Sequence, residues 1–188
     1  MACRDASGLP DLAYWGIAAL ERTPLSDEDA MALALAQARA AAEEGEVPVG
    51  AVALIGGNVV AVRHNEREGA ADPTAHAEIL ALRDAATTVG GWRLSELTLV
   101  VTLEPCPMCA GALVAARVRR VVFGATDPRA GACGTLYNLC TDPRLNHELE
   151  VMGGVGATAC AALLSSFFAG KRTDRAAGAT PSASGGVA

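Results

Sequence analysis

The sequence predicts a three-layer α/β/α sandwich, in which helices cover both faces of a mixed five-stranded β-sheet. Helical and strand patterns follow one another in the order α-β-β-α-β-α-β-β-α. This order is typical of a sheet with helices on both faces. In addition, the apolar strands at 97–103 and 118–123 flank a helical segment. Strands connected through a helix in this way are expected to be parallel neighbours.

The composition fits one domain with a core of small side chains. The chain has 188 residues, of which 51% are apolar and only 4% aromatic. This excludes collagen-like, disordered and disulfide-scaffold chains. The net charge of −6 matches the excess in residues 1–48, which hold three basic and nine acidic groups. An acidic chain is a poor candidate for a nucleic-acid binder, because such proteins are usually basic. The rest of this chain, however, is close to neutral.

The first part of the chain is expected to contain a leader, a helix and a β-hairpin. Residues 1–25 are interpreted as a loose leader. Ser26 is a suitable helix N-cap, because three acids follow it in the first turn, and the helix should end at Gly45. The segments 49–55 and 58–63 are separated by a Gly-Gly pair, which predicts two strands joined by a tight turn.

The middle of the chain is expected to alternate between helix and strand. A polar loop over 64–73 precedes a helix over about 75–88, for which Thr74 is the expected cap. The β-branched run at 97–103 predicts a buried strand. Pro105 is expected to open the next helix.

The C-terminal part is expected to complete the sheet, add a last helix and end in a disordered tail. A strand at 118–123 precedes a loop-rich segment over 124–147. A short strand near 148–152 and a helix near 157–169 should follow. The Ser-, Gly- and Ala-rich residues 173–188 predict a disordered tail.

No segment is expected to cross a membrane or to direct secretion. The start of the chain contains acids and lacks the apolar stretch of a signal peptide. Residues 151–170 carry no charge, but their glycines, threonine and serines favour a strand and a buried helix over a membrane span. Six cysteines in a chain of this length indicate reduced thiols. These features predict a cytoplasmic protein.

Three side chains that bind soft metals occur at two predicted helix starts. His76 lies in TAHAE, and Cys106 and Cys109 lie in EPCPMC. One imidazole and two thiolates suit a tetrahedral Zn²⁺ with one position left for water. Glu78 is not needed as a ligand, so its carboxylate can take a proton from that water and pass it on. We therefore expect one zinc ion per chain.

Simpler interpretations exist for each part of this group. A CxxC at a helix start can be a redox pair, and a histidine in an alanine-rich helix is often a surface residue. The joint pattern H-x-E…P-C-x-x-C is more specific, because it is the signature of zinc-dependent deaminases of nucleobases. The 30 residues between His76 and Cys106 provide room for one helix, a loop and one strand.

The chain resembles the bacterial tRNA adenosine deaminases, which form inosine at the anticodon wobble position. Six stretches carry the resemblance in the order of the family: EVPVGAV (46–52), DPTAHAEILALR (72–83), TLEPCPMCAGA (102–112), RVVFGATD (120–127), NHELEV (146–151) and CAALLSSFF (160–168). The first four also occur, with variations, in related base deaminases. The last two are more particular to the tRNA enzymes.

The resemblance implies a fold, a reaction and a substrate. The fold is the zinc deaminase sandwich over residues 26–172. The reaction is hydrolytic deamination of adenosine to inosine by a zinc-activated water that attacks C6 of adenine. His76, Cys106 and Cys109 would hold the zinc, and Glu78 would protonate N1. The implied partners are a tRNA anticodon stem-loop and a second copy of the chain, with no nucleotide cofactor.

Four further residues match positions around the substrate in this family. Asn65 matches a residue that contacts the target nucleotide, with a simple turn asparagine as the alternative. Asp127 matches a loop acid near the neighbouring ribose, where a carboxylate can accept a hydrogen bond from a 2′-OH; a turn aspartate before Pro128 is the alternative. Val47 and Phe168 match pocket walls, with core packing as the alternative.

Some features depart from the family pattern. The C-terminal helix of the family usually ends in a basic run, whereas this chain has only Lys171, Arg172 and Arg175 there. Thr126 stands where a basic residue is common. Both differences reduce the expected attraction to phosphates. The leader over 1–25 is also longer than usual.

Two other functions remain open at this point. A deaminase of free bases or nucleosides, of the guanine or cytosine type, would share the whole zinc site. A structural zinc module, or an inactive partner subunit, would share the ligands but has no use for Glu78.

Overall fold

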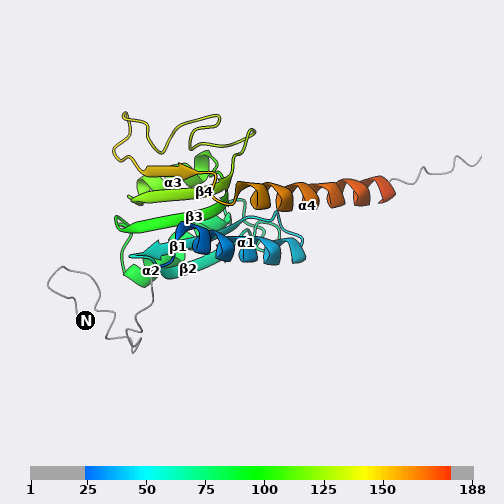
Figure 1. The fold of residues 1–188 in the computed structure, drawn as a ribbon, viewed down its shortest axis with the longest axis horizontal. Helices are drawn as coiled ribbons and strands as arrows, with labels where there is room; N and C mark the ends of the chain where they lie inside the picture. Colours follow the sequence, from blue (N-terminus) through cyan, green and yellow to red (C-terminus); the bar gives the residue numbers. More distant parts are fainter. Residues whose placement is uncertain (1–23, 179–188) are drawn as a thin grey trace, which may run out of the picture.

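In the computed structural model, which describes residues 24–178, the strands form one sheet in the order β2-β1-β3-β4-β5 (Figure 1). β1 is antiparallel to both β2 and β3, whereas β3, β4 and β5 run parallel. The elements are α1 (Asp27–Glu43), β1 (Gly50–Ile55), β2 (Asn58–His64), α2 (Ala77–Val89), β3 (Leu97–Leu103), α3 (Pro107–Ala115), β4 (Arg120–Ala125), β5 (Glu150–Gly153) and α4 (Ala157–Gly178). The expected mixed sheet and the order of elements are confirmed.

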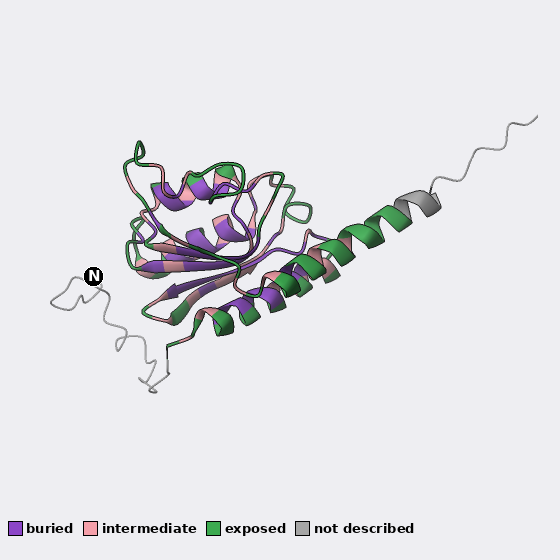
Figure 2. Ribbon diagram, turned by 45° about the horizontal axis from the view of Figure 1, so that its top comes forward, coloured by how far each residue is buried: buried purple, intermediate pink, exposed green. Residues whose placement is uncertain are grey.

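Helices cover both faces of this sheet, as the view in Figure 2 shows. α1 and α4 pack on one face, and α2 and α3 pack on the other. Ala51 and Ala53 of β1 belong to the core under α2 and α3, whereas Val52 and Leu54 belong to the core under α1 and α4. Because both faces of the central strands are buried, these strands are continuous apolar runs in the sequence.

Two local predictions are confirmed near the N-terminus. The Ser26 hydroxyl accepts the backbone N–H of Asp29 at 3.1 Å and caps α1. Gly56 and Gly57 have φ values of +57° and +78°. This left-handed pair forms the two-residue turn that joins β1 to β2, as expected for a tight hairpin.

The starts of α2 and α3 differ from the expectation by two residues each. Thr74 does not cap α2, because both its hydroxyl and its backbone N–H donate to Asp72 Oδ1 at 2.7 Å. This local turn leaves His76 as the N-cap. Similarly, α3 begins at Pro107, with Cys106 as its N-cap, and not at Pro105 as expected. The strand bounds differ from the expected ones by two residues or fewer.

The C-terminal helix is longer than expected. α4 runs to Gly178, so residues 173–178 of the expected disordered tail are helical. No glycine or proline interrupts the chain between Lys171 and Gly178, which explains the extension. The expectations for 1–23 and 179–188 fall outside the described residues. Among residues 24–178, no helix is long and apolar enough to span a membrane.

Gly50 allows α1 to lie directly against β1. A Cβ atom at this position would lie 2.1 Å from the carbonyl oxygen of Ala34 and 2.7 Å from the backbone nitrogen of Ala38. Both atoms belong to the backbone of α1, so they cannot rotate away. The helix and the strand can approach this closely only because Gly50 has no side chain.

We predict that Gly50→Ala destabilises the domain by about 3 kcal/mol, because α1 must move away from the sheet. Urea unfolding of the purified variant measures this loss. Gly91→Ala is the matched control, since nothing lies within 4 Å of the added methyl group. A free energy of unfolding equal to that of Gly91→Ala would contradict the close packing of α1.

Candidate active site

Four loops meet at one edge of the sheet, and strand direction explains why. β3 and β4 are parallel, so Cys106 and Asp127 follow their carboxyl ends at the same edge. β1 is antiparallel to β3 and β2 to β1. Val47, just before β1, and Asn65, just after β2, therefore reach that edge too. The carboxyl edge of parallel strands is a common place for ligand sites.

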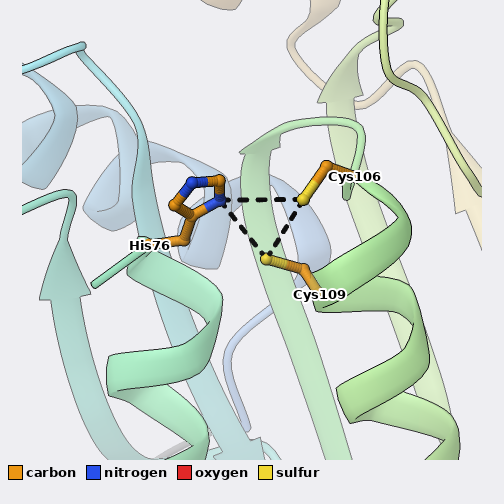
Figure 3. A group of neighbouring side chains, drawn as sticks. All are labelled: His76, Cys106 and Cys109. Atoms are coloured by element: carbon orange, nitrogen blue, oxygen red, sulfur yellow. Dashed lines mark hydrogen bonds between the residues drawn. The ribbon is translucent and has the colours of Figure 1, made fainter. Parts of the chain in front are cut away.

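The three expected metal ligands lie together at this edge (Figure 3). His76 is the N-cap of α2, Cys106 is the N-cap of α3, and Cys109 lies in the first turn of α3. His76 Nδ1 is 3.7 Å from Cys106 Sγ and 3.5 Å from Cys109 Sγ. The two sulfur atoms are 3.7 Å apart.

These distances fit a tetrahedral metal ion. Around zinc, with bonds of about 2.3 Å to sulfur and about 2.0 Å to nitrogen, two sulfurs lie about 3.8 Å apart and a sulfur and a nitrogen about 3.5 Å apart. The observed triangle has nearly the same edges. Within residues 24–178 the group offers three ligand atoms. Three ligands are typical of catalytic zinc sites, whereas structural sites usually have four.

The helix starts favour the thiolate that a metal needs. The positive ends of α2 and α3 both point at the cluster, which stabilises negative charge there. A hydrogen bond from the Cys109 thiol, assisted by His76, lowers the pKa of Cys106 to about 4. The same hydrogen bond raises the pKa of Cys109, since the two sulfurs then share one proton. The cysteine pair thus carries negative charge even before a metal binds.

Glu78 lies beside the cluster in the first turn of α2 and is only 4% exposed. Burial raises the pKa of its carboxyl group, while its own backbone N–H and nearby His76 oppose this effect. A carboxyl group with an increased affinity for protons is suited to transferring them near neutral pH.

A cavity of about 150 Å³ opens beside these residues. It is smaller than the roughly 300–1,000 Å³ of pockets for drug-sized ligands, so it suits a single ring system rather than a whole nucleotide. Its wall comprises Val47, Val49, Asn65, Arg67, His76, Glu78, Leu103, Glu104, Cys106, Asp127 and Ala130.

Phe168 is not part of this wall. Its side chain is 43% exposed on α4, and its ring packs edge-on against Phe167. α4 covers the other face of the sheet from α2 and α3, which explains the separation. Phe168 therefore does not line the cavity of this chain, and its expected role at the substrate stays a prediction.

Asn65 and Asp127 both face the pocket, and each also has a structural partner. Asn65 is 4% exposed, and its Nδ2 donates to Glu46 Oε2 at 2.8 Å. Glu46 Oε1 accepts the backbone N–H of Gly69 at 2.7 Å. Asp127 Oδ1 accepts the backbone N–H of Arg129 at 2.8 Å. For Asp127, the turn and the pocket interpretations are therefore compatible.

Sequence reasoning missed two buried carboxylates, Glu46 and Glu104. Both occur in the stretches that carry the resemblance. Glu104 is the only charge in a long apolar run, whereas Glu46 closely follows Glu43 and Glu44. For Glu104 that isolation was the available signal, because a buried charge needs partners. Burial by itself would raise the pKa of Glu104. Hydrogen bonds from Thr135 and from backbone N–H groups outweigh this effect and lower the pKa.

The other described cysteines are buried, as expected for small apolar side chains. Cys133 Sγ and Cys140 Sγ lie 3.4 Å apart. Cys160 Sγ lies 3.7 Å from the sulfur of Met31. Cys3 lies outside the described residues.

Comparison with known proteins identifies the family. A family model described as MafB19-like deaminase matches residues 25–171. The tRNA-specific adenosine deaminase of Bacillus subtilis is 51% identical over 142 residues, which cover 76% of this chain and 88% of that protein.

Two solved structures illustrate the range of related enzymes. One comes from studies of A-to-I editing by tRNA:A34 deaminases at the wobble position; it has a TM-score of 0.70 at 42% identity and covers 72% of this chain and 98% of its own. The other is a guanine deaminase from Nitrosomonas europaea, with a TM-score of 0.65 at 27% identity, covering 79% of this chain and 87% of its own. The chain therefore belongs to the MafB19-like deaminases and, among them, to the family of tRNA-specific adenosine deaminases.

Proposed function

We propose that this protein hydrolyses adenosine to inosine at the wobble position of a tRNA anticodon. The observation that carries the proposal is the meeting of three metal ligands and a buried Glu78 beside a cavity that suits a single base. The relatives named tRNA-specific adenosine deaminase support the choice of substrate.

One zinc ion per chain would be held by His76, Cys106 and Cys109. When bound, zinc supplies a fourth position for water and lowers the pKa of that water towards about 7, so that a nucleophile is available at neutral pH. The nitrogen and sulfur donors, their tetrahedral spacing and the charge on the cysteine pair all suit this ion.

Glu78 is proposed to carry the protons of the reaction. It takes a proton from the attacking water and delivers it to N1 of adenine, which makes C6 more electrophilic. It then takes the proton of the new hydroxyl group on C6 and passes it to the amino group, so that the C6–N bond breaks, ammonia leaves and inosine is formed. Burial assists both transfers, because it raises the pKa of the carboxyl group and so increases its affinity for a proton.

The pocket walls would bind and orient the substrate. The target base must leave its stack to reach a site of this kind. We propose that Val47 packs against that base and that Asn65, held by Glu46, orients it. Asp127 would accept a hydrogen bond from the 2′-OH of the neighbouring ribose, a contact that favours RNA over DNA.

We propose that the working form is a cytoplasmic homodimer bound to the anticodon stem-loop. Large apolar side chains are exposed in one loop, namely Leu136, Tyr137 and Leu145. Exposed apolar groups that gather in this way often mark contact surfaces between proteins.

Purified zinc-loaded protein should convert adenosine to inosine in an anticodon stem-loop, as detected by sequencing the RNA. Free guanine, cytosine and adenosine, tested under the same conditions, should release no comparable ammonia. Release of ammonia from guanine without inosine in the RNA would instead identify a base deaminase, the activity of the Nitrosomonas europaea structure.

We predict that Cys106→Ala removes the metal. Elemental analysis should find about one zinc per chain in the wild type and close to none in the variant, because two remaining ligands bind zinc weakly. Cys160→Ala is the matched control. Cys160 is also buried, but it lies in α4 on the other face of the sheet from α2 and α3, so the substitution should leave the zinc content unchanged. Full zinc content in Cys106→Ala would disprove the ligand set.

We predict that Glu78→Gln keeps zinc and the fold but slows turnover by about 10³-fold or more, since the amide cannot shuttle protons. Single-turnover kinetics on the stem-loop measure the loss. The exposed Glu96→Gln serves as control and should react at the wild-type rate. Comparable rates in the two variants would remove Glu78 from the mechanism.

A further inference from the structure

Glu104 is a buried carboxylate that is neither one of the expected metal ligands nor the proposed proton carrier. It lies two residues before Cys106 and is 2% exposed. Oε1 accepts the backbone N–H groups of Cys133 and Thr135, each at 3.0 Å. Oε2 accepts the backbone N–H of Asp127 at 3.0 Å and the hydroxyl of Thr135. All four donors belong to residues 127–135, which we call the Asp127 segment.

The backbone of the Asp127 segment lies directly against the carboxylate of Glu104. A Cβ atom at Gly131 would lie 2.3 Å from Glu104 Oε2 and 2.5 Å from its Cδ, so only glycine fits. Next to it, the backbone N–H of Ala132 donates to the carbonyl oxygen of Pro105 at 2.8 Å. The segment is therefore docked on the turn that leads into the metal-binding helix.

We propose that Glu104 is a positioning residue that holds the Asp127 segment against the metal-binding turn and thereby places the Asp127 carboxylate at the pocket. An anion suits this task, because each carboxylate oxygen can accept two hydrogen bonds. The docking stands on the contacts above. Its consequence for ribose recognition rests on the role proposed for Asp127.

Glu104→Gln is expected to remove the hydrogen bond to Asp127 and to keep those to the backbone of Cys133 and Thr135. The amide has the same shape but only one acceptor oxygen. If this oxygen replaces Oε1, it still accepts from Cys133 and Thr135, and the Thr135 hydroxyl can rotate to accept from the amide nitrogen. The N–H of Asp127 then faces another donor. The reverse orientation would leave two backbone donors unsatisfied, so the first is favoured.

Amide hydrogen exchange on the zinc-loaded full chain tests the docking without using activity. In Glu104→Gln, the amide of Asp127 should exchange about ten-fold faster or more, while those of Cys133 and Thr135 stay within about three-fold of wild type. Unchanged exchange at Asp127 would overturn the proposal. Thr135→Val is the control, because it replaces only the hydroxyl with a methyl group and should leave the Asp127 amide protected.

Gly131→Ala tests how closely the segment lies against Glu104. The added methyl group would lie 2.3 Å from Glu104 Oε2 and 2.6 Å from the carbonyl oxygen of Asp127, so it disturbs both the docking contact and the turn within the segment. Exchange should then accelerate at Asp127, Cys133 and Thr135 together. Protection of all three amides in this folded variant would contradict the close docking of the segment on Glu104.

Kinetics test the link to the substrate. Two stem-loops are compared, one with ribose and one with 2′-deoxyribose next to the target adenosine. Glu104→Gln should lose most of the preference for ribose through KM, with zinc content unchanged. The double variant that combines Glu104→Gln with Asp127→Ala should prefer the ribose stem-loop to the same extent as Asp127→Ala alone, because both changes remove the same contact.

The remaining outcomes are distinguishable. If Asp127→Ala itself retains the preference, the ribose contact is wrong, and the link from Glu104 to recognition fails with it, whatever the exchange data show for docking. If Glu104→Gln loses zinc, or loses kcat equally on both stem-loops, Glu104 supports the metal turn and the proposal is wrong.

Discussion

The convergence of two helix N-termini at one edge of the sheet is the constraint on which this site depends. α2 brings His76 and Glu78 there, and α3 brings Cys106 and Cys109. Three of these four side chains can carry negative charge in a partly buried place, where charges repel strongly. Two helix dipoles offset part of this repulsion, and a divalent cation would offset most of the rest. The site thus gathers groups whose negative charge a bound cation would balance.

Two buried glutamates at the same edge show how surroundings decide the role of a carboxyl group. Burial raises the pKa of Glu78, because few donors stabilise its charge. Glu104 is buried as well, yet donors from the Asp127 segment lower its pKa. One carboxyl group is therefore suited to exchanging protons, and the other is a fixed anion around which a loop can be built. Such separation of carboxyl roles by environment is common in enzyme sites.

The sequence could predict features that depend on residues close together in the chain. Apolar strand patterns, the Ser26 cap and the metal ligands are of this kind, because each follows from local spacing and side-chain chemistry. The start of α2 could not be placed, because Thr74 has two competing partners within a few residues, the helix and Asp72. Its hydroxyl cannot satisfy both.

Features that depend on distant residues were out of reach. Glu104 binds residues 23 to 31 positions away, and no spacing rule connects them. A lone acid in an apolar run indicates only that partners must exist, not where they lie. The position of Phe168 away from the cavity wall was out of reach for the same reason, since its location depends on the face of the sheet that α4 covers. Long-range packing, rather than local pattern, decides both positions.

The acidic net charge can be reconciled with an RNA substrate once the acids are located. Glu46, Glu78 and Glu104 are buried, so their carboxyl groups lie inside the protein and not on the surface that RNA would contact. Asp27 forms two hydrogen bonds with Arg120, at 2.7 and 2.8 Å, which neutralise it locally. The surface is therefore less acidic than the sum of charges indicates, although it is not strongly basic either. With the proposed pocket contacts, most of the binding energy would come from the base and the ribose rather than from phosphates. Recognition of this kind depends weakly on salt and strongly on how firmly the pocket loops are held, which is the task proposed for Glu104.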